Sequence, residues 1–278
     1  MKIFTEYFLI SCAFLFSGCK DFEKFKDDPI PYTGTKILAH KGGGSPPYTN
    51  YPDNTMEAVI FGFANADGIE IDVQKSRGNT LWLFHNGFLP PCNGNDKERI
   101  SGKYDSEIEE HIRCVGGGFN IDQLEEVFIY HRNHKLDKKI SLDVKSWLPT
   151  LHSNSPKYHT YLAYRLIALV FHYNMMDHVM VECENTYFLN ILKDKGNLQC
   201  YLTTFGDFEE GARKALKNDY AGISYSYYVN DPLSKEDIQK LRKKGLRIQL
   251  WTINSKDEIL KAMALEPDYI QTDNVLLQ

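Results

Sequence analysis

The sequence predicts a single (β/α)₈ barrel, and two observations lead to this fold class. Short runs rich in β-branched and aromatic residues alternate with longer stretches of helical character from residue 36 onward. The chain has 278 residues, and such barrels form one unit of roughly 250 residues. A strand followed by a helix, repeated eight times, is typical of a closed parallel barrel. We therefore expect one domain over residues 36–278.

The composition excludes several other classes. With 42% hydrophobic residues, 19 glycines and 11 prolines, the chain is neither disordered nor collagen-like. Lys plus Arg is 32 and Asp plus Glu is 37, so the net charge is −5. Nucleic-acid binders usually carry a basic excess, and we expect no such partner. Six cysteines are too few for a disulfide scaffold of this length.

Eight runs are assigned to the barrel strands, namely 37–41, 68–74, 140–145, 179–184, 198–204, 221–225, 246–252 and 268–272. Helix starts between them are indicated by an N-cap residue followed three positions later by an acid. These pairs are Asn54 with Glu57, Asp122 with Glu125, and Ser255 with Glu258. Gly245 follows a basic helical turn and suits a helix end.

A ninth run, 81–85, does not fit the repeat. Residues 76–80 are too few for a parallel crossover, so we expect an antiparallel hairpin arm. Residues 87–120 then form a long insertion after residue 86, which we expect to shape the active site. The insertion contains Cys92 and Cys114, and the sequence leaves open whether they form a disulfide. Cys183 and Cys200 are expected to be buried free thiols.

The first 18 residues are predicted to be a signal peptide. A short apolar run is followed by Ser17-Gly18 directly before Cys19, which resembles the lipobox of bacterial lipoproteins. The resemblance implies cleavage before Cys19 and a lipid anchor on it, and the alternative is a plain secretory signal. Residues 19–35 would then be a tether. We expect an exported, membrane-anchored protein in the periplasm or on the cell surface.

Candidate chemistry lies at the carboxyl ends of the strands, where barrel active sites form. Glu70 and Asp72 share one face of their strand, and the apolar residues between them share the other. Two carboxylates pointing into a barrel repel each other unless a cation lies between them. We therefore expect one Ca²⁺ or Mg²⁺ ion, with Asp143 as a third oxygen ligand and Lys145 beside it for an anionic substrate. The next strand carries Glu182 and Glu184.

Two histidines complete this set. His40 ends the first strand and His85 ends the hairpin arm. A metal, a lysine and two histidines suit phosphodiester cleavage, because one imidazole can deprotonate the nucleophile and the other can protonate the leaving alkoxide. A single Glu-x-Asp pair is more often a structural ion pair, but here the acids recur on consecutive strands beside Lys145 and both histidines.

The ordered motifs of the chain resemble the glycerophosphodiester phosphodiesterases of the phospholipase-C-like TIM-barrel superfamily. The matching segments are His40-Lys41-Gly42, Pro52-Asp53-Asn54-Thr55, Gly68-Ile69-Glu70-Ile71-Asp72-Val73, His85-Asn86, Leu142-Asp143-Val144-Lys145, Trp251-Thr252-Ile253-Asn254 and Ile270-Gln271-Thr272-Asp273. Together they span about residues 37–274 and are far more specific than any one motif.

The resemblance implies a role for each matching residue. The acid–base pair would be His40 and His85, and the divalent metal would be held by Glu70, Asp72 and Asp143. Phosphate contacts would come from Lys41 and Lys145, and Trp251 would line the substrate cleft. Members of the family cleave a small-molecule glycerophosphodiester to glycerol 3-phosphate and an alcohol, and a substrate hydroxyl can attack first to give a cyclic phosphate.

Four positions depart from the family pattern. Lys41 stands for Arg, Asp53 for Glu, Asn86 for Asp and Asp143 for Glu. Two alternatives therefore stay open. One is a related enzyme acting on another phospholipid or a polymer phosphodiester. The other is a non-catalytic lipoprotein that binds a phosphorylated ligand. The sequence does not indicate the substrate's alcohol group, the metal's identity or the oligomeric state.

Overall fold

The computed structural model describes residues 30–92, 94, 97–146, 156–228 and 233–277. The predicted signal peptide and Cys19 lie outside these residues, so the membrane anchor stays a prediction. Among the described helices, none combines the length and apolar character needed to cross a membrane.

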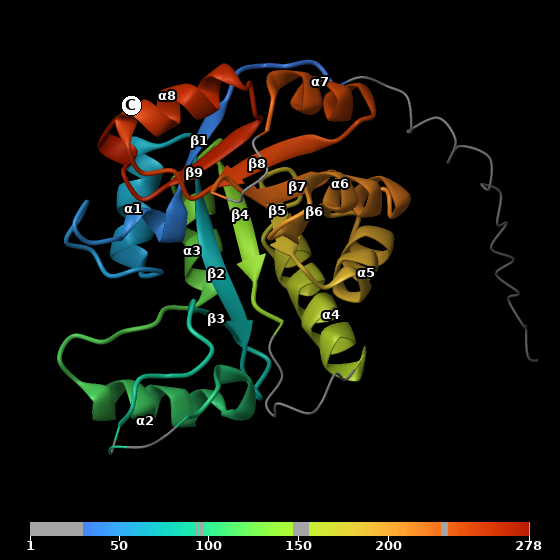
Figure 1. The fold of residues 1–278 in the computed structure, drawn as a ribbon. Helices are drawn as coiled ribbons and strands as arrows, with labels where there is room; N and C mark the ends of the chain where they lie inside the picture. Colours follow the sequence, from blue (N-terminus) through green and yellow to red (C-terminus); the bar gives the residue numbers. More distant parts are fainter. Residues whose placement is uncertain (1–29, 93, 95–96, 147–155, 229–232, 278) are drawn as a thin grey trace, which may run out of the picture.

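Eight parallel strands close into a barrel (Figure 1). They are β1 (Lys36–Ala39), β2 (Gly68–Lys75), β4 (Lys139–Val144), β5 (Val179–Cys183), β6 (Gln199–Thr204), β7 (Gly222–Ser226), β8 (Arg247–Trp251) and β9 (Tyr269–Thr272). The order around the barrel is β1-β9-β8-β7-β6-β5-β4-β2. Pairing of β1 with β2, with Leu38 opposite Gly68, closes the circle. The predicted fold class is confirmed.

Helices cover the outside of the barrel and bury the outward faces of the strands. They are α1 (Met56–Asn65), α3 (Leu124–Asn133), α4 (Pro156–His172), α5 (Thr186–Gly196), α6 (Phe208–Lys217), α7 (Lys235–Lys243) and α8 (Lys256–Ala264). After β9 the described chain forms only the short 3₁₀ turn η4 (Val275–Leu277).

The hairpin arm is present as predicted. β3 (Leu81–Leu83) pairs antiparallel with β2, with Val73 opposite Leu83. The insertion that follows contains a 3₁₀ turn η3 (Ile100–Gly102) and a helix α2 (Asp105–Val115), neither of which was predicted from the sequence. A small apolar cluster joins the hairpin arm to the insertion. It is formed by Trp82, Phe84, Leu89, Ile100, Ile108 and Ile121. Cys92 and Cys114 form a disulfide with their Cα atoms 5.5 Å apart, which ties α2 to the start of the insertion.

The other two cysteines are free and buried, as expected. Cys183 ends β5 and Cys200 lies in β6, and both belong to the apolar core between the strands and the helices. Burial raises the pKa of the Cys183 thiol to about 12. A thiol in this state packs as a small apolar group.

Two of the three predicted helix starts are off by one residue. Ser255 caps α8 as expected, but Thr55 caps α1 and Gln123 caps α3. The reason is that the predicted cap residues have other partners. Asp122 accepts a hydrogen bond from the backbone N of Met56 at 2.7 Å, so it caps the neighbouring helix α1. Asn54 is turned toward the barrel interior, as shown below.

The β2 side chains alternate as the sequence predicted. Ile69, Ile71 and Val73 join the core between the strands and the helices. Glu70 and Asp72 point inward and are each only 1% exposed. The barrel is closed at its base by a separate apolar cluster of Leu38, Met180, Tyr201 and Tyr269. The inward-facing polar side chains therefore stand on an apolar floor.

Helix α1 packs closely against the turn η2 (His40–Gly43) that follows β1. A Cβ atom at Gly62 of α1 would lie 2.2 Å from the carbonyl oxygen of Gly42. We predict that Gly62→Ala lowers the free energy of unfolding by about 1–3 kcal/mol, although helix propensity alone favours Ala by about 1 kcal/mol. Chemical denaturation would measure the change. Ile60→Ala, at a 41% exposed position of the same helix, is the control and should change little. A more stable Gly62→Ala variant would contradict the close packing.

Candidate active site

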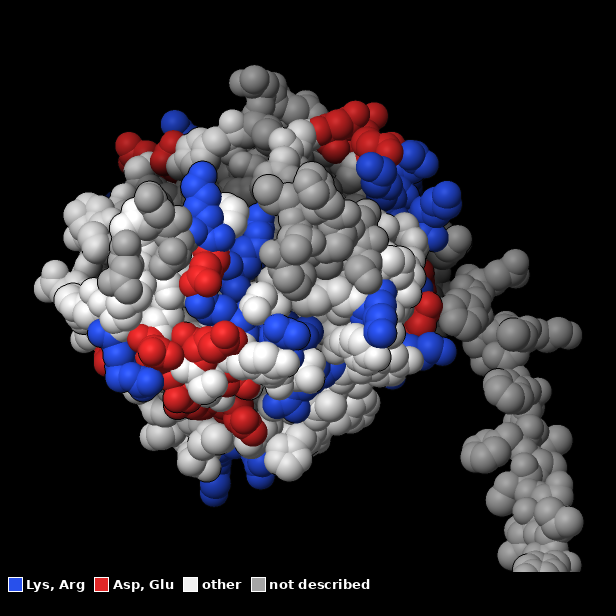
Figure 2. Space-filling view, turned by 90° about the horizontal axis from the view of Figure 1, so that it is seen from below, with Lys and Arg blue, Asp and Glu red and all other residues white. Residues whose placement is uncertain are grey.

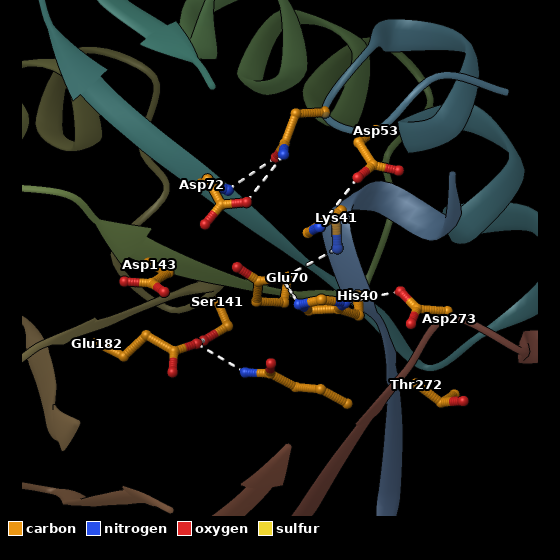
Figure 3. A network of polar contacts seen from close by, with 12 residues as sticks. His40, Lys41, Asp53, Glu70, Asp72, Ser141, Asp143, Glu182, Thr272 and Asp273 are labelled. Atoms are coloured by element: carbon orange, nitrogen blue, oxygen red, sulfur yellow. Dashed lines mark hydrogen bonds and ion pairs between the residues drawn. The ribbon is translucent and has the colours of Figure 1, made fainter. Parts of the chain in front are cut away.

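A polar site lies at the carboxyl ends of β1, β2, β4 and β9 (Figure 3). Its centre is a group of three carboxylates, Glu70, Asp72 and Asp143, each of which offers an oxygen within 4.8 Å of the other two. Asp72 and Asp143 are register partners on β2 and β4, so the parallel pairing of these strands sets the two side chains side by side. The structure therefore brings together the three acids that the sequence predicted.

These carboxylates carry more negative charge than their surroundings neutralise. Burial raises the pKa of Glu70 well above its usual value, and the charges of Asp72, Glu182 and Asp143 raise it further. Burial also raises the pKa of Asp143 to about 7, a rise that Lys145 only partly offsets. A bound cation would relieve both effects, because it favours the ionised form of every carboxylate around it.

Asp72 is held in its charged form by its neighbours. Burial works against the charge, but Lys145, His85 and His40 outweigh it, and the pKa of Asp72 is lowered. Lys145 Nζ lies 3.0 Å from Asp72 Oδ1 and also pairs with Asp143. These two acids offset the effect of burial and raise the pKa of Lys145, which stays a cation. Lys145 thus lies beside the acids, where its ammonium group would contact an anion bound next to them.

Asn54 orients Asp72 from the opposite side. Its Nδ2 donates to Asp72 Oδ2 at 2.9 Å, and its Oδ1 accepts from the backbone N of Asp72 at 2.8 Å. Asn54 adopts a left-handed backbone with φ 59°, which asparagine tolerates better than most residues. This fixed amide leaves Asp72 Oδ1 facing Lys145 and the other acids.

The three acids fit a hard divalent cation. All the donors are carboxylate oxygens, and Ca²⁺ and Mg²⁺ prefer oxygen ligands. Glu70 and Asp72 are almost completely buried, and in the described part of the chain Lys145 is the one lysine that pairs with any of the three carboxylates. Buried anions of this kind need a cation or protons. Glu70, Asp72 and Asp143 are thus the residues that could hold a metal.

His40 is the first residue after β1 and is held by a chain of side chains. Its Nδ1 lies 2.7 Å from Asp273 Oδ1. Asn254 Nδ2 donates to Asp273 Oδ2 at 2.6 Å, and the backbone N of Asp273 donates to Asn254 Oδ1 at 2.8 Å. A proton on Nδ1 is thereby favoured, which leaves Nε2, 3.7 Å from Glu70, with its lone pair facing the acids. This is the geometry of a general base oriented by a carboxylate.

Lys41 continues the turn with a left-handed backbone, φ 52°. The turn points its backbone N at Glu70 Oε2, 2.9 Å away, so that the peptide orients the carboxylate. Its side chain runs outward, and Nζ lies 3.0 Å from Asp53 Oδ2. Burial lowers the pKa of Lys41, but the hydrogen bond and charge of Asp53 more than offset this and raise it.

His85 lies beyond β3 and is positioned by Gln74. The buried Gln74 Nε2 donates to the carbonyl oxygens of Phe84 and Asn86, both at 2.8 Å, and so holds the chain on each side of His85. The backbone N of Phe84 donates to Asp72 O at 3.0 Å. His85 lines a pocket of about 190 Å³ that also includes Lys41, Asp53 and Phe119. The insertion therefore forms one wall of the space beside this imidazole.

Two further residues lie at the strand ends. Trp251 ends β8, which is separated from β2 by β1 and β9, and its ring lies 5.5 Å from that of Phe205. Its predicted contact with substrate is not tested by the geometry. Glu184 follows β5 and is exposed, whereas Glu182 is buried inside the barrel. Both glutamates therefore lie at the carboxyl end of β5, one inside the barrel and one at the surface.

Sequence reasoning missed the roles of Asn54, Asp273 and Gln74. Asn54 was interpreted as a helix cap, and Asp273 appeared only as part of a motif. Both residues lie within motifs of the family pattern, so the sequence indicated their positions but not their hydrogen-bond partners. Gln74 carried no signal, because its two acceptors are backbone carbonyls that come near only through the hairpin.

The profile of the Glycerophosphoryl diester phosphodiesterase family matches residues 40–277. The chain belongs to this family. It is 24% identical over 251 residues to a glycerophosphodiester phosphodiesterase of Caldanaerobacter subterraneus, covering 86% of this chain and 94% of that protein. The fold is similar to that of a crystal structure from Silicibacter pomeroyi described as a putative glycerophosphoryl diester phosphodiesterase. Its TM-score is 0.74 and its identity 16%, covering 91% of this chain and 94% of that one.

A second solved structure has a bound product. It is a phosphodiesterase of Oleispira antarctica in complex with sn-glycerol-3-phosphate, with TM-score 0.65 and 15% identity, covering 86% of this chain and 93% of that one. Membership in the family makes the chain an enzyme of the phosphodiesterase type and confirms the resemblance found in the sequence.

Two of the four departures from the family pattern are partners. Lys41 stands for Arg and Asp53 stands for Glu, and the two side chains form an ion pair with each other. A lysine, unlike an arginine, does not form two parallel hydrogen bonds with a carboxylate. Replacing Glu with the shorter Asp therefore costs fewer hydrogen bonds opposite a lysine than opposite an arginine. The third departure, Asn86, lies beside His85 with its Oδ1 3.2 Å from His85 Nδ1. Lys41 and Asp53 thus neutralise each other in this chain.

The face around the site carries separate patches of charge. α2 lies at the bottom of Figure 1 and carries the exposed Glu107, Glu109 and Glu110. Figure 2 views the molecule from below and shows one large acidic patch with Lys and Arg in a band beside it, and smaller acidic groups near the edges of the view. An approaching anion meets the basic band more favourably than the acidic patch.

Cation binding is predicted to displace a proton from this site. The pKa of Asp143 is about 7, so below that pH a cation must compete with a proton. The affinity for Ca²⁺ or Mg²⁺ should then fall by about tenfold or more per pH unit below this pKa, because Glu70, whose pKa is also raised, competes for protons as well. Calorimetric titrations at about pH 6 and pH 8, in buffers of different ionisation enthalpy, would measure both effects. Equal affinities at the two pH values, with no proton released, would contradict the prediction.

Proposed function

We propose that this protein hydrolyses glycerophosphodiesters to glycerol 3-phosphate and an alcohol, with a divalent cation and two histidines. The observation that carries the proposal is the convergence of Glu70, Asp72 and Asp143 beside His40 and His85 at one end of the barrel. The relatives named glycerophosphodiester phosphodiesterase, and the neighbour with bound glycerol 3-phosphate, support the choice of substrate.

The proposed mechanism uses the residues as the geometry arranges them. Glu70, Asp72 and Asp143 would hold the cation, which would supply positive charge beside the phosphoryl group. His40 Nε2 takes the proton of the attacking hydroxyl, from water or the substrate's own glycerol, while Asp273 holds the ring in place. His85 donates a proton to the leaving alkoxide. Where the glycerol hydroxyl attacks, this step gives a cyclic phosphate, and water then opens the ring to give glycerol 3-phosphate. Lys41 and Lys145 attract the phosphate, and Trp251 lines the cleft.

We further propose that the enzyme is a lipoprotein anchored through Cys19. The small residues directly before this cysteine support the proposal. A lipid anchor would hold the barrel at a membrane surface in the periplasm or outside the cell. Metabolic labelling with a fatty-acid probe, compared between the full chain and Cys19→Ser, would test this.

Removal of divalent cations is predicted to abolish the activity. The metal-free site keeps its excess of buried carboxylates, and a lysine alone does not replace a divalent ion beside the phosphate. Glycerol 3-phosphate release from glycerophosphocholine and glycerophosphoethanolamine, before and after chelation, would measure this. Calcium or magnesium should restore the rate, and His40→Ala should remain inactive. Full activity after chelation would contradict the proposed function. Activity only on other phosphodiesters would favour a related substrate class.

Asp273→Asn is predicted to lower kcat by about 10²-fold or more, with a smaller effect on KM. An amide at this position can face His40 with its NH₂ group, which favours the wrong tautomer of the imidazole. Steady-state kinetics on a glycerophosphodiester would separate kcat from KM. Asp257→Asn, on the exposed side of α8, is the matched control. An Asp273→Asn enzyme with unchanged kcat would show that Asp273 does not position the base.

A further inference from the structure

A buried polar layer lies inside the barrel next to the three acids, and Glu182 of β5 is at its centre. Glu182 is only 2% exposed. Its Oε1 accepts hydrogen bonds from Ser141 Oγ, Gln249 Nε2 and Gln271 Nε2, each at 2.8 Å. Its Oε2 accepts from Ser224 Oγ. The four donors come from β4, β7, β8 and β9, so the barrel surrounds this side chain with donors.

The four groups around Glu182 supply the hydrogen bonds that a carboxylate needs. Both of its oxygens accept from a neighbour, and a carboxylate is an acceptor only. The charge has no cationic partner of its own, because among the described residues no Lys, Arg or His forms an ion pair with Glu182. A buried anion without a counter-charge is costly unless a cation lies near.

Glu182 is adjacent to the candidate metal ligands without being one of them. It is the register partner of Asp143 on the neighbouring strand, and both side chains face the barrel interior. Ser141, which donates to Glu182, is the register partner of Glu70. Figure 3 shows Glu182 and Ser141 on the side of Glu70 away from Asp72. Its hydrogen bonds to the four donors hold it in place, so it does not turn to join the ligand group.

We propose that Glu182 is a positioning residue whose fixed negative charge strengthens cation binding by Glu70, Asp72 and Asp143 from outside the ligand set. The inference rests on the proposed metal-dependent function. Charge–charge attraction in a buried site falls slowly with distance, so an anion one strand away still acts on the ion. In the absence of the metal, the four hydrogen bonds stabilise the Glu182 carboxylate and hold it in position.

Glu182→Gln removes the charge and keeps the shape. The amide oxygen can take the place of Oε1 and accept from Ser141, Gln249 and Gln271. The amide nitrogen then faces Ser224, whose hydroxyl can turn to accept. Glu184→Gln is the matched control, since Glu184 is an exposed glutamate two residues further along the chain. Glu182→Asp keeps the charge on a shorter side chain.

The test is calorimetric titration of the full chain with CaCl₂ or MgCl₂ alone, with the melting temperature measured in the absence of metal. We expect Glu182→Gln to weaken cation binding by about tenfold or more, Glu184→Gln to bind like the unmodified chain, and Glu182→Asp to bind more tightly than Glu182→Gln. The metal-free melting temperature should not fall in Glu182→Gln, because a purely structural role would lower it.

Three results would overturn the inference. They are an unchanged affinity in Glu182→Gln, an equal loss in Glu182→Asp, or a Glu182→Gln variant that does not fold. If the unmodified chain binds neither ion, the proposed metal dependence fails together with the inference. If it binds an ion and only the Glu182 comparison fails, the proposed function stands without it.

Discussion

The constraint on which the site depends is the burial of negative charge inside a closed barrel. Glu70, Asp72 and Glu182 are all nearly inaccessible to water, and Asp143 stands beside them. Such a group is stable only with donors, protons or cations around it. The groups around these carboxylates supply donors and positive charge. Asn54 and the Lys41 peptide donate to the acids, Lys145 pairs with two of them, and the polar layer surrounds Glu182.

Closure of the barrel joins motifs that are far apart in the chain. His40 and Asp273 are 233 positions apart, yet their side chains are in hydrogen-bond contact. The pairing of β1 with β9 brings them together, because the carboxyl ends of parallel neighbours meet at the same edge. Asn254, at the end of the loop after β8, then fixes Asp273. A base oriented in this way relies on the last strand of the barrel as much as on the first.

His85, the second histidine, is positioned by contacts different from those that orient His40. His85 belongs to an antiparallel arm outside the eight-stranded repeat, and a single buried amide, Gln74, holds the chain on both sides of it. The disulfide and the small apolar cluster of the insertion support the wall that faces this histidine. The two imidazoles thus reach one site from segments that are supported independently of each other.

The sequence by itself determined the strand–helix repeat, the antiparallel arm and the inward direction of Glu70 and Asp72, because each depends on local periodicity or on a loop length. It also indicated the acids and the histidines through motifs. The tertiary structure alone decided which residues share hydrogen bonds. Asn54 turned from an expected helix cap into a partner of Asp72, Asp122 capped a helix other than the one beside it, and Asp53 paired with Lys41. These partners are 12 or more positions apart in the chain and meet only when it folds, so no local pattern could identify them.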